Sequence, residues 1–499
     1  MSHPPRASVV IAGGGIAGLA AAFFLRDTPF QITVLEGSPR LGGKLAVSGI
    51  AGVAVDEGAE ALLTRRPEGT GLIGAVGLAG GLVWPGTTAA RIWSRGEMHA
   101  LPRRQFMGVP ADLGELARSG LVSAGGMARA RRDLDLPATG RDGDVPVAAY
   151  VGGRFGHEVV DRLVDPLLGG VYAGRAEQLS FEATLPALAS ESRRHASLAE
   201  AADALAGPAQ PGDASRPVFT TLAAGLGTLP AAVAAASGAT VRTSAMVRGL
   251  SRTAAGWRLT VGSAHDEEQL TADALVLAVP AGPSARLLAG VPGASAAVAA
   301  LREISYASMA IVTLAYPAAA FPHPPQASGY LVPAVDGRPV KAVTFSSVKW
   351  PHLQDGTGLV FVRCSLGRIG EEAVLQTGDD DLAAIAARDL AAATGARGAP
   401  VATRVTRWGG ALPQYTVGHL GRVARIRAEV ARQPGLAVCG AAYDGIGIPA
   451  CVATARLAAS QIMDYLAARG AAAGGGEMAD NGGAGKQAMA GTDGGINRD

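Results

Sequence analysis

Three glycines and one acidic residue near the N-terminus have the types and the spacing that dinucleotide binding requires. Gly13, Gly15 and Gly18 follow the pattern G-x-G-x-x-G, and Glu36 lies 18 residues after Gly18. Glycines let the backbone and a helix N-terminus approach a pyrophosphate closely, and a carboxylate at this distance accepts hydrogen bonds from ribose hydroxyls. A turn that simply needs glycine is the alternative explanation of the glycine spacing alone.

The elements that must position these residues can also be read from the sequence. Residues 8–12 form a short β-branched apolar run, which is typical of a buried strand, and residues 16–26 continue as an apolar helix. Residues 31–35 form a second strand that ends at Glu36. Because strand, glycine turn, helix, strand and acid occur in order, the segment predicts a Rossmann-like cofactor unit rather than an isolated turn.

The pattern continues beyond Glu36 with Arg40, Gly42 and Gly43, followed by Lys44. Units that bind NAD need nothing particular at these positions. An R-x-G-G element after the ribose acid resembles the extended fingerprint of FAD enzymes of the amine-oxidase and glutathione-reductase superfamily. In those folds the chain turns back over the pyrophosphate, so small residues are needed there. The resemblance therefore favours FAD over NAD.

Composition and charge exclude several classes of function. The chain has 499 residues, a net charge of +2 and 17% charged residues, which gives no support for nucleic-acid binding. Its three cysteines are widely spaced, so they form no metal-binding motif or disulfide framework and favour a reducing cytoplasm. The first strand begins too early for a signal peptide. The longest uncharged stretches, 9–25 and 72–84, are glycine-interrupted and shorter than the ~20 residues of a spanning helix.

The order of the segments predicts an α/β protein with a discontinuous Rossmann-like FAD-binding domain, a mixed α+β substrate domain and an inserted helical domain. In flavoproteins of this class the chain returns to the cofactor domain through the strand at 274–279. The predicted segments are 1–60, 218–291 and 400–470 for FAD binding, 61–97 and 292–399 for the substrate domain, 98–205 for the helical domain, 206–217 for a linker, and 471–499 for a disordered tail.

Four further stretches resemble one family closely. Residues 165–174 read DPLLGGVYAG, and they are supported by DEGAE at 56–60, ALPQYTVGH at 411–419 and GAAYDGIGI at 440–448. These blocks resemble the oxygen-dependent protoporphyrinogen and coproporphyrinogen oxidases, and the resemblance spans about residues 8 to 468. The blocks are far more specific than the glycine pattern.

The resemblance implies an FAD enzyme of haem biosynthesis that dehydrogenates a porphyrinogen in three two-electron steps. Hydride would pass to the flavin, and O2 would reoxidise the flavin to give H2O2. The family suggests no acid–base residue, so none is assigned. The FAD contacts implied by position are Gly13, Gly14, Gly15, Ile16, Ala17, Gly18, Glu36, Gly37, Arg40, Gly43, Lys44, Gly58, Ala59, Glu60, Ala61, Val247, Trp408, Ile446, Gly447 and Ile448.

The substrate is predicted from charge. Many relatives have Gly-Pro-Arg or Gly-Pro-Asp where this chain has Gly58-Ala59-Glu60, so a substrate role for an arginine there cannot be transferred. Coproporphyrinogen III carries four propionates and protoporphyrinogen IX carries two, and arginines are natural partners of carboxylates. Arg65, Arg66, Arg103 and Arg104 are candidates, and Arg66 is favoured because its place resembles a basic position in bacterial relatives. We therefore expect coproporphyrinogen III, with protoporphyrinogen IX as the alternative.

Two other classes compete with this interpretation. Another amine oxidase or desaturase of the superfamily would lack the block at 171–174, and a flavin-free binding protein would not need Glu36 or the R-x-G-G element. We expect a cytoplasmic enzyme without a metal. Peripheral contact with the inner face of the cell membrane and contact with later haem-pathway enzymes both stay open.

Overall fold

A five-stranded parallel sheet carries the N-terminal glycine turn. The structure is a computed structural model that describes residues 6–137, 143–206, 218–354 and 356–480. The sheet has the order β12-β2-β1-β16-β22, and every neighbouring pair of its strands is parallel. Its strands are β1 (Ser8–Ala12), β2 (Gln31–Leu35), β12 (Thr240–Arg242), β16 (Ala274–Leu277) and β22 (Leu436–Val438). The segments come from distant parts of the chain, which confirms the predicted α/β class with a discontinuous cofactor domain.

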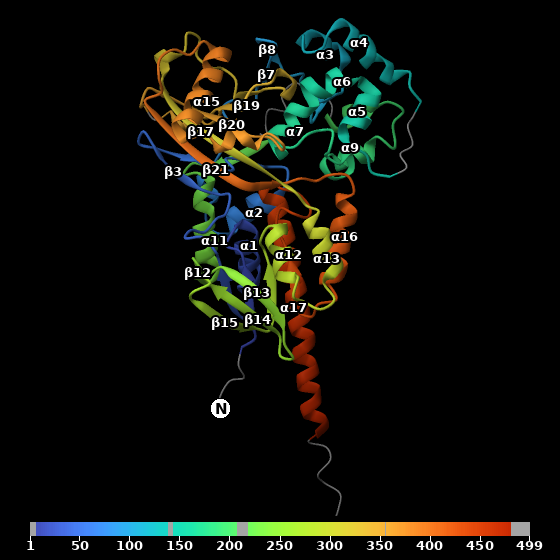
Figure 1. Ribbon diagram of the computed structural model, residues 1–499, viewed down its shortest axis with the longest axis vertical. Helices are drawn as coiled ribbons and strands as arrows, with labels where there is room; N and C mark the ends of the chain where they lie inside the picture. Colours follow the sequence, from blue (N-terminus) through green and yellow to red (C-terminus); the bar gives the residue numbers. More distant parts are fainter. Residues whose placement is uncertain (1–5, 138–142, 207–217, 355, 481–499) are drawn as a thin grey trace, which may run out of the picture.

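Both faces of this sheet are covered, which explains why its strands β1, β16 and β22 are almost entirely apolar. Val9 and Ile11 pack on one side, whereas Val10 and Ala12 pack on the other. The first side carries α1 (Ile16–Leu25), α11 (Leu229–Ser237) and α17 (Ile448–Asp480) (Figure 1). The second side carries the antiparallel strands β13 (Val247–Arg252), β14 (Trp257–Gly262) and β15 (Glu267–Ala272), with α12 (Ala281–Leu288), α13 (Ser295–Arg302) and α16 (His419–Val430).

A seven-stranded sheet forms the second half of the molecule, with the order β21-β17-β20-β19-β18-β7-β8. Its strands are β7 (Ala90–Ser94), β8 (Glu97–Ala100), β17 (Tyr306–Pro317), β18 (Gly329–Leu331), β19 (Val340–Phe345), β20 (Leu359–Leu366) and β21 (Ala402–Pro413). Helix α15 (Asp379–Thr394) packs on one face of it. The sequence predicted that the substrate domain ends at residue 399. Because β21 pairs with β17 up to Pro413, this sheet instead continues 14 residues further along the chain. Helix α13, predicted with the substrate segment, packs instead against α12 and α16.

The described residues of 113–137 and 143–206 are mostly helical and lie at the top of the molecule beside the seven-stranded sheet (Figure 1). The helices are α3 (Leu113–Ser119), α4 (Ala124–Arg131), α5 (Val147–Phe155), α6 (His157–Val159), α7 (Asp165–Tyr172), α8 (Phe181–Thr184), α9 (Pro186–Glu191) and α10 (Leu198–Ala206). The buried Arg154 donates to Asp133, whose carboxylate also accepts the N–H groups of Leu198 and Ala199. The predicted linker at 206–217 begins at the end of α10, and its remainder lies outside the described residues.

Several further elements are short. They are the hairpin β3 (Val47–Ile50) and β4 (Val53–Asp56), the three-stranded group β5 (Leu62–Leu63), β6 (Leu82–Val83) and β11 (Phe219–Leu222), the pair β9 (Gln105–Phe106) and β10 (Val109–Pro110), and the helices α2 (Pro67–Ala75) and α14 (Ser346–Lys349). In β5 and β11, Leu63 pairs with Phe219. Loop 56–61, between β4 and β5, therefore runs along the junction of the two sheets.

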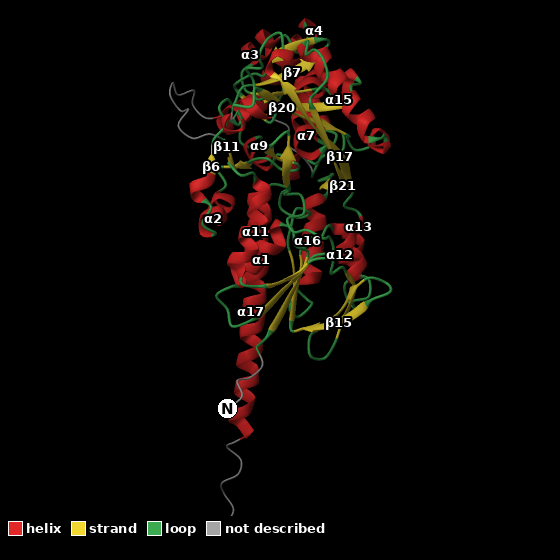
Figure 2. Cartoon of the chain, turned by 90° about the vertical axis from the view of Figure 1, so that its left-hand side faces the viewer, coloured by secondary structure: helices red, strands yellow, loops and turns green. Residues whose placement is uncertain are grey.

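The C-terminal helix corrects one prediction. Helix α17 continues to Asp480 and extends well past the parallel sheet (Figure 2), so residues 471–480 of the predicted disordered tail are helical. Residues 466–473 contain five alanines, and alanine is the strongest helix former, which the prediction from low side-chain complexity undervalued. Residues 481–499 of the predicted tail lie outside the described residues.

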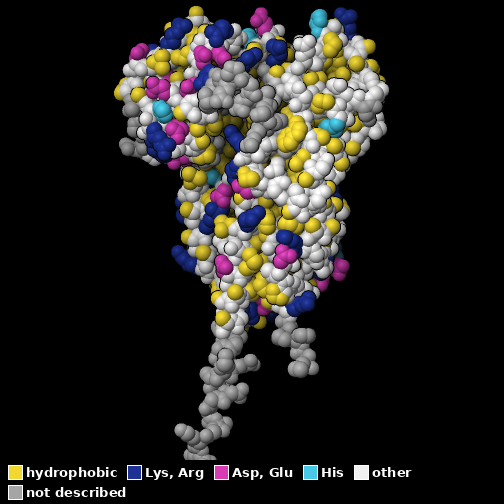
Figure 3. All heavy atoms as spheres, turned by 180° about the vertical axis from the view of Figure 1, so that it is seen from behind, with side chains coloured by type: hydrophobic (Ala, Val, Ile, Leu, Met, Phe, Trp, Pro, Cys, Tyr) yellow, Lys and Arg dark blue, Asp and Glu magenta, His cyan; other side chains and the backbone are white. Residues whose placement is uncertain are grey.

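The sequence predicted no membrane-spanning segment and no nucleic-acid binding, and the helices and the surface charge can be compared with both predictions. Within the described ranges, no helix combines the length and the apolar character that crossing a bilayer requires. On the face that Figure 3 shows, basic and acidic side chains are interspersed, in keeping with the small net charge.

Candidate functional site

The three glycines of the turn after β1 are needed for different reasons. Gly13 has a φ of +111°, and a Cβ on Gly18 would lie 1.9 Å from the carbonyl oxygen of Gly13, so these two positions serve backbone geometry and packing. Gly15 has a negative φ and precedes α1 as its N-cap. A Cβ on Gly15 would meet nothing within 4 Å. The space in front of this helix N-terminus is therefore open, as a pyrophosphate site requires.

Glu36 follows β2, directly beside the glycine turn. Its carboxylate accepts hydrogen bonds from the N–H of Gly14 at 2.7 Å and from the N–H of Ser38 at 2.8 Å. A carboxylate offers about four lone-pair sites, so two bonds leave capacity for ribose hydroxyls. Gly37 lies against Met246, because a Cβ on Gly37 would be 2.6 Å from Cε of that methionine. Val247, at the start of β13, is thereby brought next to the Glu36 end of the site.

The R-x-G-G element turns the chain back over the glycine turn. The N–H of Gly42 donates to the carbonyl oxygen of Gly14 at 2.9 Å, and Gly42 has a φ of +103°. A Cβ on Gly43 would be 3.4 Å from Cα of Gly15. Arg40 donates to the carbonyl oxygen of Gly43 at 2.7 Å and lies 5.7 Å from the centre of the Trp408 ring. Arg40 thus stabilises the turn that would cover a phosphate.

Loop 56–61 is fastened to the seven-stranded sheet. A Cβ on Gly58 would lie 2.0 Å from the carbonyl oxygen of Lys44 and 3.0 Å from the Trp408 ring, so only glycine fits there. Nε1 of Trp408 donates to the carbonyl oxygen of Glu57 at 3.0 Å. Arg363, on β20, donates to the carbonyl oxygen of Gly58 at 2.5 Å. These contacts bring loop 56–61, Lys44 and Trp408 together beside the glycine turn.

Glu60 occupies a buried ion-pair cluster. Its carboxylate accepts from Nζ of Lys349 at 2.7 Å and from the guanidinium of Arg363. Burial alone would raise the pKa of Glu60, but the two cations outweigh burial and lower its pKa to about 2. Glu60 is therefore ionised and holds the loop to β20 and α14. Its predicted contact with FAD stays a prediction.

The start of α17 forms the other wall of the site, with Ile446 and Gly447 before it and Ile448 as its first residue. Tyr415 fixes the preceding loop at both ends, because its hydroxyl donates to the carbonyl oxygen of Ala441 and accepts the N–H of Gly445, each at 2.7 Å. Burial raises the pKa of Tyr415 well above its usual range, so the hydroxyl keeps its proton. The fixed loop presents a helix N-terminus, which favours negative charge.

Lys44 joins this wall to the R-x-G-G turn. Lys44 is half-buried, and desolvation lowers its pKa, an effect that nearby Cys451 partly opposes. Cys451 lies in the first turn of α17. Lys44 is therefore a half-buried amine between the glycine turns and the α17 N-terminus.

The candidate substrate arginines have different surroundings. Arg66 is the exposed residue before α2, and its Nη2 lies 3.3 Å from Glu68. Helix α2 packs against α17, since a Cβ on Gly69 would lie 3.2 Å from Pro449. Arg66 therefore lies about one helical turn from a residue that contacts the start of α17. Arg104 already pairs with Asp203.

Sequence reasoning missed Arg363, Lys349 and the clamp made by Tyr415. Arg363 and Lys349 lie about 300 positions from Glu60 in the chain, in segments without a local motif. One signal was available for Lys349: the chain has only four lysines. Tyr415 belongs to the block ALPQYTVGH at 411–419, but its role depends on a contact with loop 441–445 that the spacing of residues in the sequence does not reveal.

Comparisons with known proteins agree with this geometry. The family described as "Flavin containing amine oxidoreductase" matches residues 16–463. A protein of Mycobacterium tuberculosis (strain ATCC 25618 / H37Rv) named "Coproporphyrinogen III oxidase" is 40% identical over 474 residues, covering 93% of this chain and 99% of its own. A Bacillus subtilis (strain 168) protein of the same name is 31% identical and covers 92% and 98%.

The solved structures include one of similar overall shape. The crystal structure of a "putative protoporphyrinogen oxidase" from Exiguobacterium sp. 255-15 matches with a TM-score of 0.81 and 30% identity. The match covers 92% of this chain and 99% of that one. The whole described arrangement, including the helical segment, thus recurs in that protein.

Proposed function

The chain belongs to the family of flavin-containing amine oxidoreductases and is an FAD-dependent oxidoreductase, and we propose that it oxidises coproporphyrinogen III to coproporphyrin III in haem biosynthesis. The observation that carries this proposal is the sequence similarity to two proteins named for that activity, which are 40% and 31% identical to this chain over nearly its full length. The open space at Gly15, in front of the α1 N-terminus, supports the placing of the FAD pyrophosphate.

In the proposed reaction the porphyrinogen loses six hydrogen atoms and three O2 molecules become three H2O2. FAD, when bound, supplies the hydride acceptor. The protein then has to hold the tetrapyrrole against the cofactor, because aromatisation provides the driving force. The buried cluster of Glu60, Lys349 and Arg363 keeps loop 56–61 rigid, and the α17 N-terminus stabilises negative charge next to it. No residue is assigned as acid or base.

We further propose that Arg66 contacts a propionate of the substrate. Arg66 is exposed at the start of α2, which packs against the first turn of α17. Its partner Glu68 is on the surface, so the ion pair costs little to exchange for a substrate carboxylate. Protoporphyrinogen IX is the second candidate, because the matched Exiguobacterium protein is named a putative protoporphyrinogen oxidase.

An assay with both substrates tests the proposal. Porphyrin fluorescence and H2O2 release are measured with coproporphyrinogen III and protoporphyrinogen IX side by side. We expect a higher kcat/KM for coproporphyrinogen III, with one H2O2 for each electron pair. A higher value for protoporphyrinogen IX would reverse the substrate assignment, and no porphyrin with either one would refute the function.

The cellular setting is part of the same proposal. We place the enzyme in the cytoplasm, where its product passes to a later enzyme of the haem pathway. Peripheral contact with the inner face of the membrane stays a prediction.

A further inference from the structure

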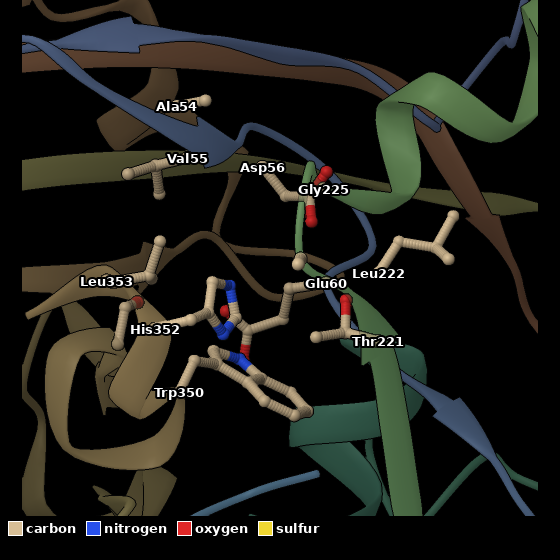
Figure 4. Close-up of a pocket in the computed structure, with 12 residues that line it drawn as sticks. Ala54, Val55, Asp56, Glu60, Thr221, Leu222, Gly225, Trp350, His352 and Leu353 are labelled. Atoms are coloured by element: carbon tan, nitrogen blue, oxygen red, sulfur yellow. The ribbon is translucent and has the colours of Figure 1, made fainter. Parts of the chain in front are cut away.

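A small cavity lies directly behind Glu60, at the junction of the two sheets (Figure 4). It has about 20 Å³ of space for the centre of a water molecule, and about 10–15 Å³ is enough for one. The wall is built from three separate segments: the end of β4, strand β11, and residues 346–353 around α14. The cavity therefore spans segments that meet only in the folded chain.

Four polar atoms of this wall are buried and have no hydrogen-bond partner among the residues that the structure describes. They are Oγ1 of Thr221, Oγ of Ser346, Nε1 of Trp350 and Nδ1 of His352. Thr221, Ser346 and Trp350 are each at most 3% exposed, so bulk solvent does not reach them. Buried polar groups without a partner are rare and costly, so four of them around one cavity form a polar lining suited to a small molecule.

The charges on the wall restrict what that molecule is. The carboxylates of Asp56 and Glu60 also line the cavity, which opposes an anion. Glu60 already has two cationic partners, and the indole N–H of Trp350 can only donate, which opposes a metal ion. A small neutral molecule that both donates and accepts satisfies the hydroxyls, the imidazole and the indole together.

We propose that this cavity is a built site for one ordered water molecule. The water accepts the N–H of Trp350 and bonds to two or three of the remaining unpartnered atoms, within the usual number of partners for a buried water. Figure 4 shows Trp350, His352 and Thr221 gathered around Glu60. The water thereby ties β11 and residues 346–353 to the base of loop 56–61. This inference depends on the protein structure alone and not on the proposed substrate.

Replacing Thr221 distinguishes a wet cavity from a dry one by the sign of the effect. In Thr221→Val a methyl group takes the place of the hydroxyl at nearly constant volume. If water is bound, the change removes one of its partners, and we expect Tm to fall by on the order of 1–2 °C. If the cavity is dry, the change removes an unpaired buried hydroxyl, and Tm rises. A rise in Tm would overturn the proposal.

The neighbouring residue on the same strand provides the control. Oγ1 of Thr220 donates to the carbonyl oxygen of Val83 at 2.8 Å, and Thr220 is fully buried. Thr220→Val therefore reports the loss of a known hydroxyl hydrogen bond on β11. We expect the Tm of Thr221→Val to shift in the same direction as that of Thr220→Val. Opposite shifts would show a dry cavity.

A crystal structure of the FAD-loaded enzyme observes the molecule directly. At a resolution that reveals other buried waters, we expect one density peak within hydrogen-bond distance of Nε1 of Trp350 and Oγ1 of Thr221. In Trp350→Phe, which lacks the donor, this peak should weaken or disappear. Trp257→Phe is the control, because that buried indole already donates to the carbonyl oxygen of Pro434 at 3.1 Å. An empty cavity, or direct bonding among the four side chains, would refute the water site.

Discussion

Gly15 is the glycine of its turn whose Cβ position is open, whereas a Cβ on Gly13 or Gly18 would meet backbone atoms. A substitution at Gly15 therefore tests the cofactor site rather than the fold. Gly15→Val places its side chain in open space at a backbone conformation that valine adopts readily. We therefore expect a folded protein that no longer binds FAD, because the side chain fills the pyrophosphate position. Flavin absorbance of the purified protein and far-UV circular dichroism measure the two properties separately.

The control for this substitution is Gly18→Val. There the Cβ would collide with the carbonyl oxygen of Gly13 inside the protein, so folding itself should suffer. If Gly15→Val keeps its full yellow colour, the open space at Gly15 is not where the cofactor's phosphates bind.

Glu60 gives a prediction about pH. Because its pKa is lowered in the folded protein, ionised Glu60 contributes stability above its unfolded pKa of 4.5. This contribution is lost as the pH falls from 4.5 towards about 2. Glu60→Gln leaves Lys349 and Arg363 buried without their anion, so we expect a loss of about 3–5 kcal/mol in the free energy of unfolding at pH 7.

Denaturant unfolding at pH 7 and at pH 3 measures both parts of this prediction. The difference between wild type and Glu60→Gln should be smaller at pH 3. A surface control is Glu268→Gln, whose partner Arg242 is half-exposed, and which should change stability little. A constant difference between pH 7 and pH 3 would contradict the assigned cause.

Arg66 tests the choice of substrate. Its ion pair with Glu68 is exposed, so Arg66→Ala should leave the fold intact. A lost hydrogen bond between charged groups costs about 1.5–3 kcal/mol, which is on the order of 10- to 100-fold in KM. We expect the larger increase for coproporphyrinogen III, which has more propionates to satisfy. Arg194→Ala, at a remote exposed pair, is the control, and equal increases for both substrates would make Arg66 a general contact.

At the scale of elements, the loop before α17 depends on one hydroxyl. Tyr415→Phe removes both of its hydrogen bonds, to Ala441 and Gly445, but keeps the ring that stacks on His419 at 3.8 Å. We expect weaker FAD binding, by about 1–3 kcal/mol, because the α17 N-terminus is no longer held in place. Flavin titration by fluorescence quenching measures this loss.

Tyr330→Phe is the matched control, since the hydroxyl of Tyr330 is buried on β18 and finds no partner in the part of the chain that the structure describes. This change should leave FAD affinity unaltered. Equal losses of affinity in the two variants would mean that the effect comes from general destabilisation rather than from the clamp.

The elements also show where sequence reasoning succeeds. Residues 8–36 form one contiguous unit, so periodicity and spacing predicted its two strands and its helix correctly, whereas the ribose-binding role of Glu36 stays a prediction. The contact of Arg363 with Glu60 links positions 303 residues apart, and no local pattern specifies such a pairing. The boundary at residue 400 differed from the sheet because a strand's sequence does not show which sheet it joins. Helix α17 beyond residue 470 was missed because glycine-rich composition outweighed alanine propensity.

At the scale of the whole molecule, the predicted cofactor site joins segments from both ends and the middle of the chain. The glycine turn, loop 56–61, Trp408 and the start of α17 are brought together only by folding. FAD bound across them should therefore stabilise the folded state by RT ln(1 + [FAD]/Kd), or about 2.7 kcal/mol at one hundred times Kd. Removal of FAD should lower Tm, and added FAD should restore it progressively.

Thermal unfolding at increasing FAD concentrations measures this linkage, with Gly15→Val as the matched control that has the fold but not the site. Intrinsic fluorescence and flavin release should change together in the wild type, because one ligand holds the segments at the junction of the two sheets. The helical segment contributes no predicted FAD contact. The backbone around its buried Arg154–Asp133 pair should therefore be equally resistant to proteolysis with and without FAD. A Tm that does not depend on FAD concentration would mean that the site does not couple the distant segments, and the predicted contacts would then have to be reassigned one by one.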